Sequence, residues 1–305
     1  MKRFLVYIFL TLLLVISIDL VGRVSLYYLI KNIPNNTSHL SKVYKSLSID
    51  SVGFIVVGMS TAEHNYNIKI FEDSLLMLGY DCGSDGRNIY YDYMVVSNAI
   101  KNAMELKLVI VDISRATLTN ETKDRINIVY PFYWANPTVR EVTKDLKGKK
   151  MDVFMLSSLY QMNSGLQNIW RLFHPLSFKE YHGFSPYPYT ENAINIRNSK
   201  IINNSLDVDE KVVEYLNKIV KDCKNNNISV LLVTSPCLTR DRETSIWLSE
   251  YALKHNVEYY DYSSCEEIIS NSSFFRDEYH LNEKGAEIYS KIVAMRVKSQ
   301  MSNLW

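Results

Sequence analysis

Apolar runs alternate with polar, helix-like stretches along most of the chain. The runs 52–58 (VGFIVVG), 106–113 (LKLVIVDI) and 228–236 (ISVLLVTSP) are continuous and rich in β-branched residues. This pattern is typical of strands that are buried on both faces of a parallel sheet. The short segment 79–83 (GYDCG) and the run 257–262 (VEYYDY) add two more strands, so five are predicted.

Helical patterns lie between the predicted strands. They extend from Ser60 to about residue 78 and over about 88–105, 207–226 and 242–255, and a last helix follows Asn282 as its N-cap. The alternation, with connections too long for hairpins, predicts a parallel sheet with helices on both faces. In such sheets the chemistry collects at the carboxyl ends of the strands.

The N-terminus has the pattern of a membrane anchor. Lys2 and Arg3 precede an uncharged run over 4–18, which Asp19 interrupts. Because we find no small-x-small cleavage site and no cysteine to take a lipid, we expect an uncleaved signal anchor over residues 1–22. The positive-inside rule then places the globular part outside the cytoplasm. The alternatives are a cleaved signal peptide or a buried first helix.

The rest of the chain suits one large α/β domain. Residues 23–50 are predicted to form a stalk, because the stretch from about 32 to 50 is polar and turn-rich, and 51–305 form the domain. The segment at about 114–205 breaks the strand–helix rhythm and is rich in aromatic residues and proline. It could form a lid or substrate wall over the strand ends, or a structural addition without a ligand.

Charge and cysteines exclude some functions. Lysine plus arginine (34) nearly balance aspartate plus glutamate (33), so nothing favours nucleic acid as a partner. Four cysteines show no CxxC spacing, so no zinc, redox or other cofactor site is predicted: Cys82, Cys223, Cys237 and Cys265. Disulfides and buried free thiols both remain open.

Three residues could carry chemistry. Ser60 follows a buried strand through a glycine and opens a helix, where backbone N–H groups point outward. Asp277 and His280 stand three residues apart, directly ahead of the last helix. Ser60 is either an ordinary helix cap or a nucleophile. The Asp–His pair is either a surface turn or two thirds of a hydrolytic triad.

Three motifs carry a resemblance to a known family. VVGMS (56–60), CGSDGRN (82–88) and RDEYHLNEKGAEIY (276–289) resemble the first, second and fifth blocks of the SGNH, or GDSL, hydrolases. The resemblance covers about residues 50–114 and 207–298. It implies a flavodoxin-like, three-layer α/β fold with Ser60 as nucleophile, His280 as base and Asp277 as orienting acid.

The resemblance also implies an oxyanion hole. The Ser60 N–H is one donor, and the Gly86 N–H matches the glycine of the second block, with Gly83 as the alternative. The family's third block supplies an asparagine that is missing from VDISRATL (111–118). One of three side chains would have to replace it: Ser114, Arg115 or Thr117. Loss of one oxyanion donor costs about a hundredfold or more in rate.

The membrane anchor and the missing third block resemble one branch of the family. That branch adds or removes acyl groups on envelope polysaccharides, as alginate O-acetylation proteins and the D-alanyl transfer protein of teichoic acid do. It implies a polysaccharide substrate and a multi-spanning membrane acyltransferase as partner. Two alternatives are a binding or scaffold protein that has lost catalysis, and a lipase or thioesterase.

Aromatic and histidine side chains supply further candidates. Trp134, Trp170, Phe173 and Tyr181 could stack on sugar rings or pack within their own subdomain, and Tyr187 lies in a rigid turn that could edge the cleft. Among the histidines, His64 is expected on a helix surface, although it could crowd or assist the site. No metal-ligand spacing involves His174 or His182.

Overall fold

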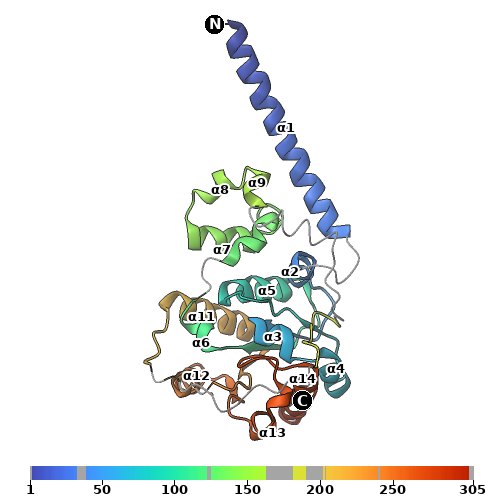
Figure 1. Cartoon of the computed structure of the whole chain (residues 1–305), viewed down its shortest axis with the longest axis vertical. Helices are drawn as coiled ribbons and strands as arrows, with labels where there is room; N and C mark the ends of the chain where they lie inside the picture. The colour runs from blue at the N-terminus through green and yellow to red at the C-terminus, as the bar shows by residue number, and fades with distance from the viewer. Residues whose placement is uncertain are drawn as a thin grey trace. The chain divides into compact units, whose positions relative to one another are not determined.

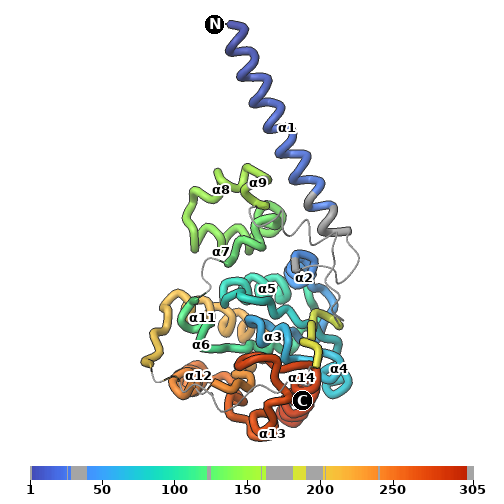
Figure 2. The backbone as a smooth tube through the Cα atoms, viewed as in Figure 1, coloured from blue at the N-terminus to red at the C-terminus, as the bar shows by residue number. Residues whose placement is uncertain are grey.

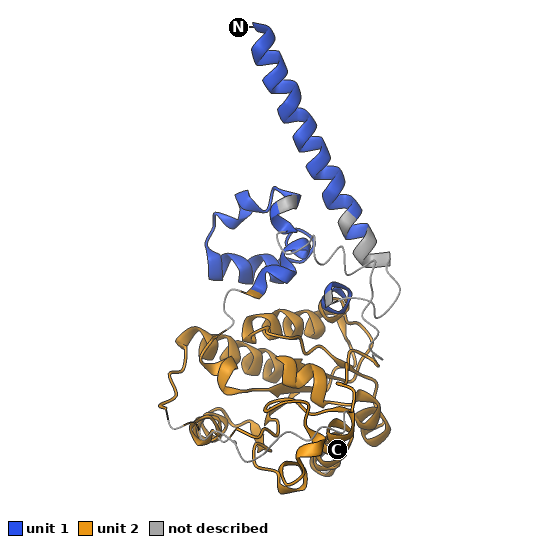
Figure 3. Cartoon of the chain, in the orientation of Figure 1, with its two compact units in different colours: residues 1–44, 126–176 blue, residues 45–125, 177–305 orange. Residues whose placement is uncertain are grey.

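The computed structural model describes residues 2–32, 39–121, 125–162, 181–189, 202, 204–239 and 241–301. The chain divides into two compact units (Figure 3). Unit 1 comprises residues 1–44 and 126–176, and unit 2 comprises residues 45–125 and 177–305. The sheet and all three residues of the expected triad belong to unit 2.

Unit 2 is built on a five-stranded parallel sheet with the order β2-β1-β3-β4-β5. This is the flavodoxin-like strand order, in which ligands bind where the order reverses, here between β1 and β3. Figure 1 shows the helices that surround this sheet. The α/β class and the five strands are confirmed, with these bounds: β1 Phe54–Gly58, β2 Gly79–Asp81, β3 Leu108–Asp112, β4 Ser229–Thr234 and β5 Glu258–Asp261.

Helices cover both faces of the sheet because successive strand side chains point to opposite sides. On one side of the sheet, α5 (Ile89–Asn102) and α11 (Glu210–Asn225) pack together (Figure 2). On the other side lies α14 (Glu283–Met301). The core against α14 joins alternate strand residues, such as Phe54 and Val56, to the helix side chains. Further helices are α12 Arg242–His255, α6 Arg115–Leu118, α13 Glu266–Ile269 and η3 Ser272–Phe274.

The helix expected from Ser60 to about residue 78 is two helices. α3 covers Ser60–Asn65 and α4 covers Ile68–Leu75. The chain turns between them because the Tyr66 side chain enters the core. Its hydroxyl donates to the carboxylate of Asp112 over 2.7 Å and lies 3.1 Å from the hydroxyl of Tyr289.

Unit 1 contains an N-terminal helix and part of the insertion. Its elements are α1 Lys2–Asn32, the start of α2 His39–Leu47, most of η1 Arg125–Phe132, α7 Pro137–Lys147, α8 Met151–Phe154 and α9 Ser158–Gln161. By length and composition, α1 could cross a membrane over Lys2–Ser25. Its apolar side chains are exposed, so the alternative of a buried first helix is wrong.

Where the sequence predicts a stalk over 23–50, the structure has the end of α1 and the helix α2. Three apolar residues of α2, Leu40, Val43 and Leu47, recur at helical spacing and are buried, which explains why a polar segment forms a packed helix. The four cysteines are free thiols, and two of them, Cys82 and Cys223, are buried.

Candidate active site

A sharp turn between β1 and α3 presents Ser60. Gly58 ends β1 with a φ of +145°, a conformation that favours glycine. A Cβ atom at Gly58 would lie 2.7 Å from the carbonyl oxygen of Asp112. Ser60 is the first residue of α3, so its half-buried side chain stands at a helix N-terminus beside the carboxyl end of the sheet.

A tight loop carries Asp277 and His280. The Arg276 N–H donates to the carbonyl oxygen of His280 over 2.8 Å and closes the loop. The N–H of Leu281 donates over 3.0 Å to Oδ1 of Asn65 in α3, which fastens the loop to the serine helix. α14 begins directly behind, and the side-chain oxygen of Asn282 accepts two N–H groups of its first turn.

The structure brings the three expected triad residues together. His280 Nε2 lies 2.6 Å from Ser60 Oγ. His280 Nδ1 lies 2.8 Å and 2.9 Å from the two carboxylate oxygens of Asp277. An ionised carboxylate only accepts, so the imidazole carries its proton on Nδ1 and its Nε2 accepts from the serine hydroxyl. This is the arrangement that activates a serine nucleophile.

The loop also keeps Asp277 ionised. Partial burial acts to raise the pKa of Asp277, but hydrogen bonds from the His280 ring and from the N–H groups of Tyr279 and His280 outweigh it, and the pKa is lowered from 3.8. An anion is therefore present at neutral pH to hold the imidazole and to stabilise the imidazolium that forms during proton transfer.

We expect Asp277→Asn to lower kcat by up to about 10⁴-fold, because the amide favours the wrong imidazole tautomer while the geometry stays intact. The depressed pKa adds stability that is present above pH 3.8 and lost as the pH falls through the folded-state pKa. Urea titrations should therefore give a difference in the free energy of unfolding between wild type and Asp277→Asn that is constant at neutral pH and shrinks below pH 3.8. An unchanged kcat would remove Asp277 from the triad.

Two backbone N–H groups, those of Ser60 and Gly86, are the expected oxyanion donors, and neither is hydrogen-bonded to a backbone acceptor in the part of the chain that the structure describes. The N–H of Ser60 opens α3, where helix N–H groups have no acceptor within the helix. Gly86 has a φ of +63°, and a Cβ atom there would lie 2.3 Å from a guanidinium nitrogen of Arg125. Within the described ranges, no acceptor is hydrogen-bonded to the Gly86 N–H.

The N–H of Gly83, the alternative donor, already has a hydrogen-bond acceptor. It donates to Oδ1 of Asp81 over 2.7 Å, so it is already occupied. A Cβ atom at Gly83 would lie 2.5 Å from the backbone nitrogen of Glu63. The glycine therefore allows α3 to approach the loop after β2, and the geometry favours Gly86 over Gly83 as the second donor.

The three side chains after β3 that could replace the missing asparagine, Ser114, Arg115 and Thr117, make different contacts. Both terminal nitrogens of Arg115 are engaged, one with Asp241 over 3.1 Å and the other with two backbone carbonyl oxygens. Arg115 is therefore engaged in an ion pair with Asp241, and its role as an oxyanion donor stays a prediction. Ser114 and Thr117 form a capping box on α6, and Ser114 Oγ lies 3.9 Å from the sulfur of Met59, next to the nucleophile.

A buried acid lies behind the nucleophile. The carboxylate of Asp112 accepts hydrogen bonds from the hydroxyls of Thr61, Tyr66 and Ser235. Burial raises the pKa of Asp112, although these three hydroxyls act to lower it. Asp112 thus joins the end of β3 to α3 and to the segment after β4. The only sign of it in the sequence is an acid at the end of an apolar run.

His64 is buried, with an exposed fraction of 5%, so the expectation of a helix-surface histidine is wrong. Its Nδ1 lies 2.5 Å from the carbonyl oxygen of Ser185 and its Nε2 lies 3.0 Å from Oδ1 of Asp85. The Ser185 carbonyl oxygen and the Asp85 carboxylate can only accept hydrogen bonds. A proton on each ring nitrogen of His64 therefore lets the ring donate to both. Burial acts to lower the pKa of His64, but Asp85 and Glu63 outweigh it and the pKa is raised.

Glu63, His64 and Asp85 also meet the simplest condition for a metal site, because one ligand atom from each lies within 4.8 Å of the others. A metal ion would have to replace the proton on His64 Nε2, since a metal ligand needs a free lone pair there. The hydrogen bond from His64 to Asp85 accounts for the contact without an ion.

The predicted substrate residues lie in different places. The Tyr187 ring packs against the His64 ring with centroids 3.9 Å apart and planes tilted by 33°, and it lies 5.6 Å from the ring of His280. Tyr181 donates instead to Glu72 of α4, and His182 contacts the same carboxylate. Trp134 belongs to unit 1. Three further candidates, Trp170, Phe173 and His174, lie outside the described residues.

No protein-family model matches the chain, and no curated protein matches it. Seven chains of solved structures are similar, among them the following three. A proposed acylhydrolase from Bacteroides fragilis NCTC 9343 has 13% identity and a TM-score of 0.39, over 89% of this chain and 93% of its own. A proposed lipolytic protein of the G-D-S-L family from Desulfitobacterium hafniense DCB-2 has 9% identity and a TM-score of 0.39, over 80% and 98%.

The third is a GDSL-like lipase from Bacteroides thetaiotaomicron VPI-5482, with 9% identity and a TM-score of 0.38, over 84% of this chain and 90% of its own. The chain is thus similar to proteins described as acylhydrolases and lipases of the GDSL type. The functional argument below rests on the geometry of the site.

Proposed function

We propose that this protein is an extracytoplasmic serine O-acyltransferase or esterase of the SGNH type that acts on a cell-envelope polysaccharide. The observation that carries the proposal is the hydrogen-bonded array of Ser60, His280 and Asp277, with Nε2 of the histidine 2.6 Å from the serine oxygen. A serine at a helix N-terminus, a base within hydrogen-bond reach and an acid that orients the base are the parts that acyl transfer requires.

In the proposed reaction, Ser60 Oγ attacks the acyl carbonyl carbon and His280 Nε2 takes the hydroxyl proton. The N–H groups of Ser60 and Gly86 hold the negative oxygen of the tetrahedral intermediate. His280 then gives its proton to the leaving group, and the acyl group stays on Ser60. In the second half, His280 removes a proton from a sugar hydroxyl or from water, which takes the acyl group and frees the serine.

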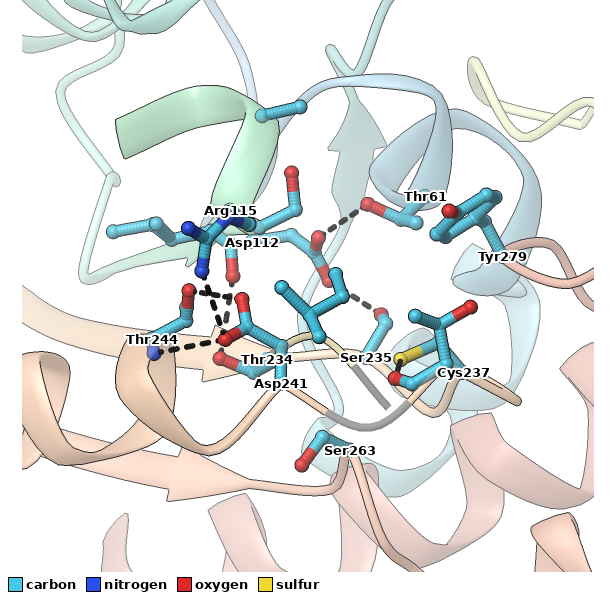
Figure 4. Close-up of a pocket in the computed structure, with 15 residues that line it drawn as sticks. Thr61, Asp112, Arg115, Thr234, Ser235, Cys237, Asp241, Thr244, Ser263 and Tyr279 are labelled. Carbon is cyan, nitrogen blue, oxygen red and sulfur yellow. Dashed lines mark hydrogen bonds and ion pairs between the residues drawn. The ribbon is translucent and has the colours of Figure 1, made fainter. Parts of the chain in front are cut away.

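A small cavity lined by the chain neighbours of two triad residues supports a short acyl group (Figure 4). Its lining includes Thr61, the residue after Ser60, and Tyr279, the residue before His280, together with Ile113 and Ser114. Its volume is about 110 Å³. A cavity of about 150 Å³ in another protein holds one benzene molecule. An acetyl to butyryl group therefore fits, and a long fatty acyl chain does not.

We expect the purified protein to hydrolyse p-nitrophenyl acetate and butyrate with similar kcat/KM, and the octanoate at least about tenfold more slowly, because the extra methylenes find no buried surface. Initial rates over the ester series check this. A preference for octanoate would instead support the lipase or thioesterase alternative. No turnover by a folded protein would support the binding or scaffold alternative.

A variant of the cavity wall sharpens the test. Ile113 lines the cavity and is buried, so Ile113→Ala enlarges the space and should raise the octanoate-to-acetate ratio. Ile246 is 41% exposed on α12, and Ile246→Ala should leave the ratio unchanged. The cavity is not the acyl site if both variants keep the wild-type ratio.

The envelope and the polysaccharide are inferred from the sequence. The apolar α1 supports attachment to a membrane, and the Tyr187 ring beside His280 supplies an aromatic surface where a sugar acceptor could stack. A multi-spanning membrane acyltransferase that delivers the acyl group is the partner that this proposal implies. Mass spectrometry of envelope glycans, with and without the gene, would identify the acyl group whose amount depends on the protein.

A further inference from the structure

Within unit 1, α1 is fastened to the start of α9 at one point. The carboxylate of Asp19 accepts from the N–H of Ser158 over 2.7 Å and 2.8 Å, and from the hydroxyls of Ser157 and Ser158 over 3.2 Å and 3.0 Å. Arg23 lies 3.5 Å from the same carboxylate and donates to the carbonyl oxygen of Leu156. These bonds fix residues 156–158 beside one turn of α1.

Close packing at this point supports the contact. A Cβ atom at Gly22 would lie 3.2 Å from the hydroxyl oxygen of Ser158, tighter than an ordinary contact. Glycine at this position therefore lets α9 approach the α1 backbone. The Asp19 carboxylate accepts from an N–H group at the start of α9. A negative charge at a helix N-terminus is stabilising.

The contact also sets a depth along α1. The uncharged run of α1 covers residues 4–18, and the first charges after it are Asp19 and Arg23. A hydrocarbon core of about 30 Å takes about 20 helical residues. If α1 spans a bilayer, Asp19 and Arg23 therefore lie at its outer edge, and the start of α9 lies at the same level.

Exposed apolar side chains precede α9 at that level. Val153 is 67% exposed, Phe154 41% and Leu156 60%, whereas Met155 between them is buried. We call residues 149–158 the α8–α9 corner. Isolated exposed apolar residues are common, but here three of four consecutive positions beside α1 are exposed and apolar.

The α8–α9 corner has the charges that suit a lipid headgroup region. Lys149 and Lys150 at its start are exposed. Lysines beside apolar side chains are typical of segments that lie at a membrane interface, where the apolar groups enter the acyl boundary and the amines meet anionic headgroups.

We propose that the α8–α9 corner is a lipid-contacting surface, which inserts Val153, Phe154 and Leu156 into the outer interface of the bilayer that α1 crosses. This inference rests on the proposed membrane attachment. Asp19 and Arg23 hold the α8–α9 corner to α1. The corner therefore adds a second membrane contact beside α1 and restricts the rotation of the rest of unit 1 about the axis of α1.

The test uses the full chain in vesicles of phosphatidylcholine with a minor share of phosphatidylglycerol. The partly exposed cysteines, Cys237 and Cys265, are replaced by serine. One cysteine for a fluorescent label is then introduced by Leu156→Cys. Lipids with a nitroxide near the headgroup quench labels at the interface. We expect the label at 156 to be quenched severalfold more strongly than a label at a solvent-exposed site.

Two positions make the result decisive. Met104→Cys, in unit 2 and 99% exposed, is the solvent control, and Leu14→Cys reports on α1 itself. Quenching at 14 together with a label at 156 no more quenched than the label at 104 would overturn the lipid contact and leave the anchor intact. Quenching at neither 14 nor 156 would overturn the anchor, and this inference with it.

A variant tests the role of the Asp19 contact. Asp19→Ala removes four hydrogen bonds from α9, so we expect weaker quenching at 156 and unchanged quenching at 14. Equal quenching at 156 with and without Asp19 would contradict the claim that this contact sets the depth of the α8–α9 corner.

Discussion

Ser60→Ala is expected to lower the kcat of ester hydrolysis by about 10³-fold or more, because it removes the only atom that can form the acyl-enzyme. The fold should persist, since no other described side chain than His280 is hydrogen-bonded to the Ser60 hydroxyl. Initial rates with p-nitrophenyl acetate, and circular dichroism of the same samples, check the two statements.

The control is Ser51→Ala, which changes an exposed serine and should keep wild-type rates. His280→Ala should cost about as much as Ser60→Ala, and the double variant little more, because the two groups act as one unit. Wild-type activity in Ser60→Ala would show that the array at the end of β1 is not a catalytic triad.

Asp112→Ala is expected to lower the free energy of unfolding by about 3 kcal/mol or more. The carboxylate is the shared acceptor of Thr61, Tyr66 and Ser235, and each of the two buried hydroxyls, those of Tyr66 and Ser235, costs about 1–3 kcal/mol when left without its acceptor. Because Thr61 follows Ser60, the loss should also disturb the start of α3. Urea unfolding of the full chain in detergent measures the effect.

Asp112→Asn is the conservative comparison. Its amide oxygen can still accept from one or two of the hydroxyls, so the loss should be smaller than for alanine. Asp50→Ala removes an exposed carboxylate and should change the free energy of unfolding by less than about 0.5 kcal/mol. If Asp112→Ala were as stable as Asp50→Ala, Asp112 would not hold β3, β4 and α3 together.

The sheet could be predicted from the sequence because each buried strand is a continuous apolar run. All five predicted strands are present, and the helix expected over 242–255 has those bounds in the structure. The Asp-x-x-His spacing and the cap at Asn282 likewise indicate local geometry that a short loop and a helix start determine. Local chemistry was sufficient for these elements.

Other features depend on contacts between distant residues. The break between α3 and α4 follows from the bonds of Tyr66 to Asp112 and Tyr289, which lie 46 and 223 residues away. His64 is buried because the carbonyl oxygen of Ser185, 121 residues on, and the Asp85 carboxylate meet its ring. No spacing pattern in the sequence indicates that these residues are partners.

The oxyanion site shows the same limit. Arg115 is a reasonable donor from its position after β3, but its ion pair with Asp241, 126 residues away, could not be read from the sequence. The resemblance favours Gly86 over Gly83, and the structure adds a physical reason, because the Gly83 N–H donates to Asp81. With Ser60 and Gly86 as two donors and no asparagine, we expect a site of lower hydrolytic power than a complete oxyanion hole.

The central claim is that Ser60 is an activated nucleophile. The most direct measurement is the intact mass of the full-length protein after treatment with a fluorophosphonate, followed by peptide mapping, alongside Ser60→Ala and Ser51→Ala. The account predicts one adduct, on Ser60, in the wild type and in Ser51→Ala, and none in Ser60→Ala. A folded wild-type protein without an adduct, or an adduct that Ser60→Ala retains, would contradict it.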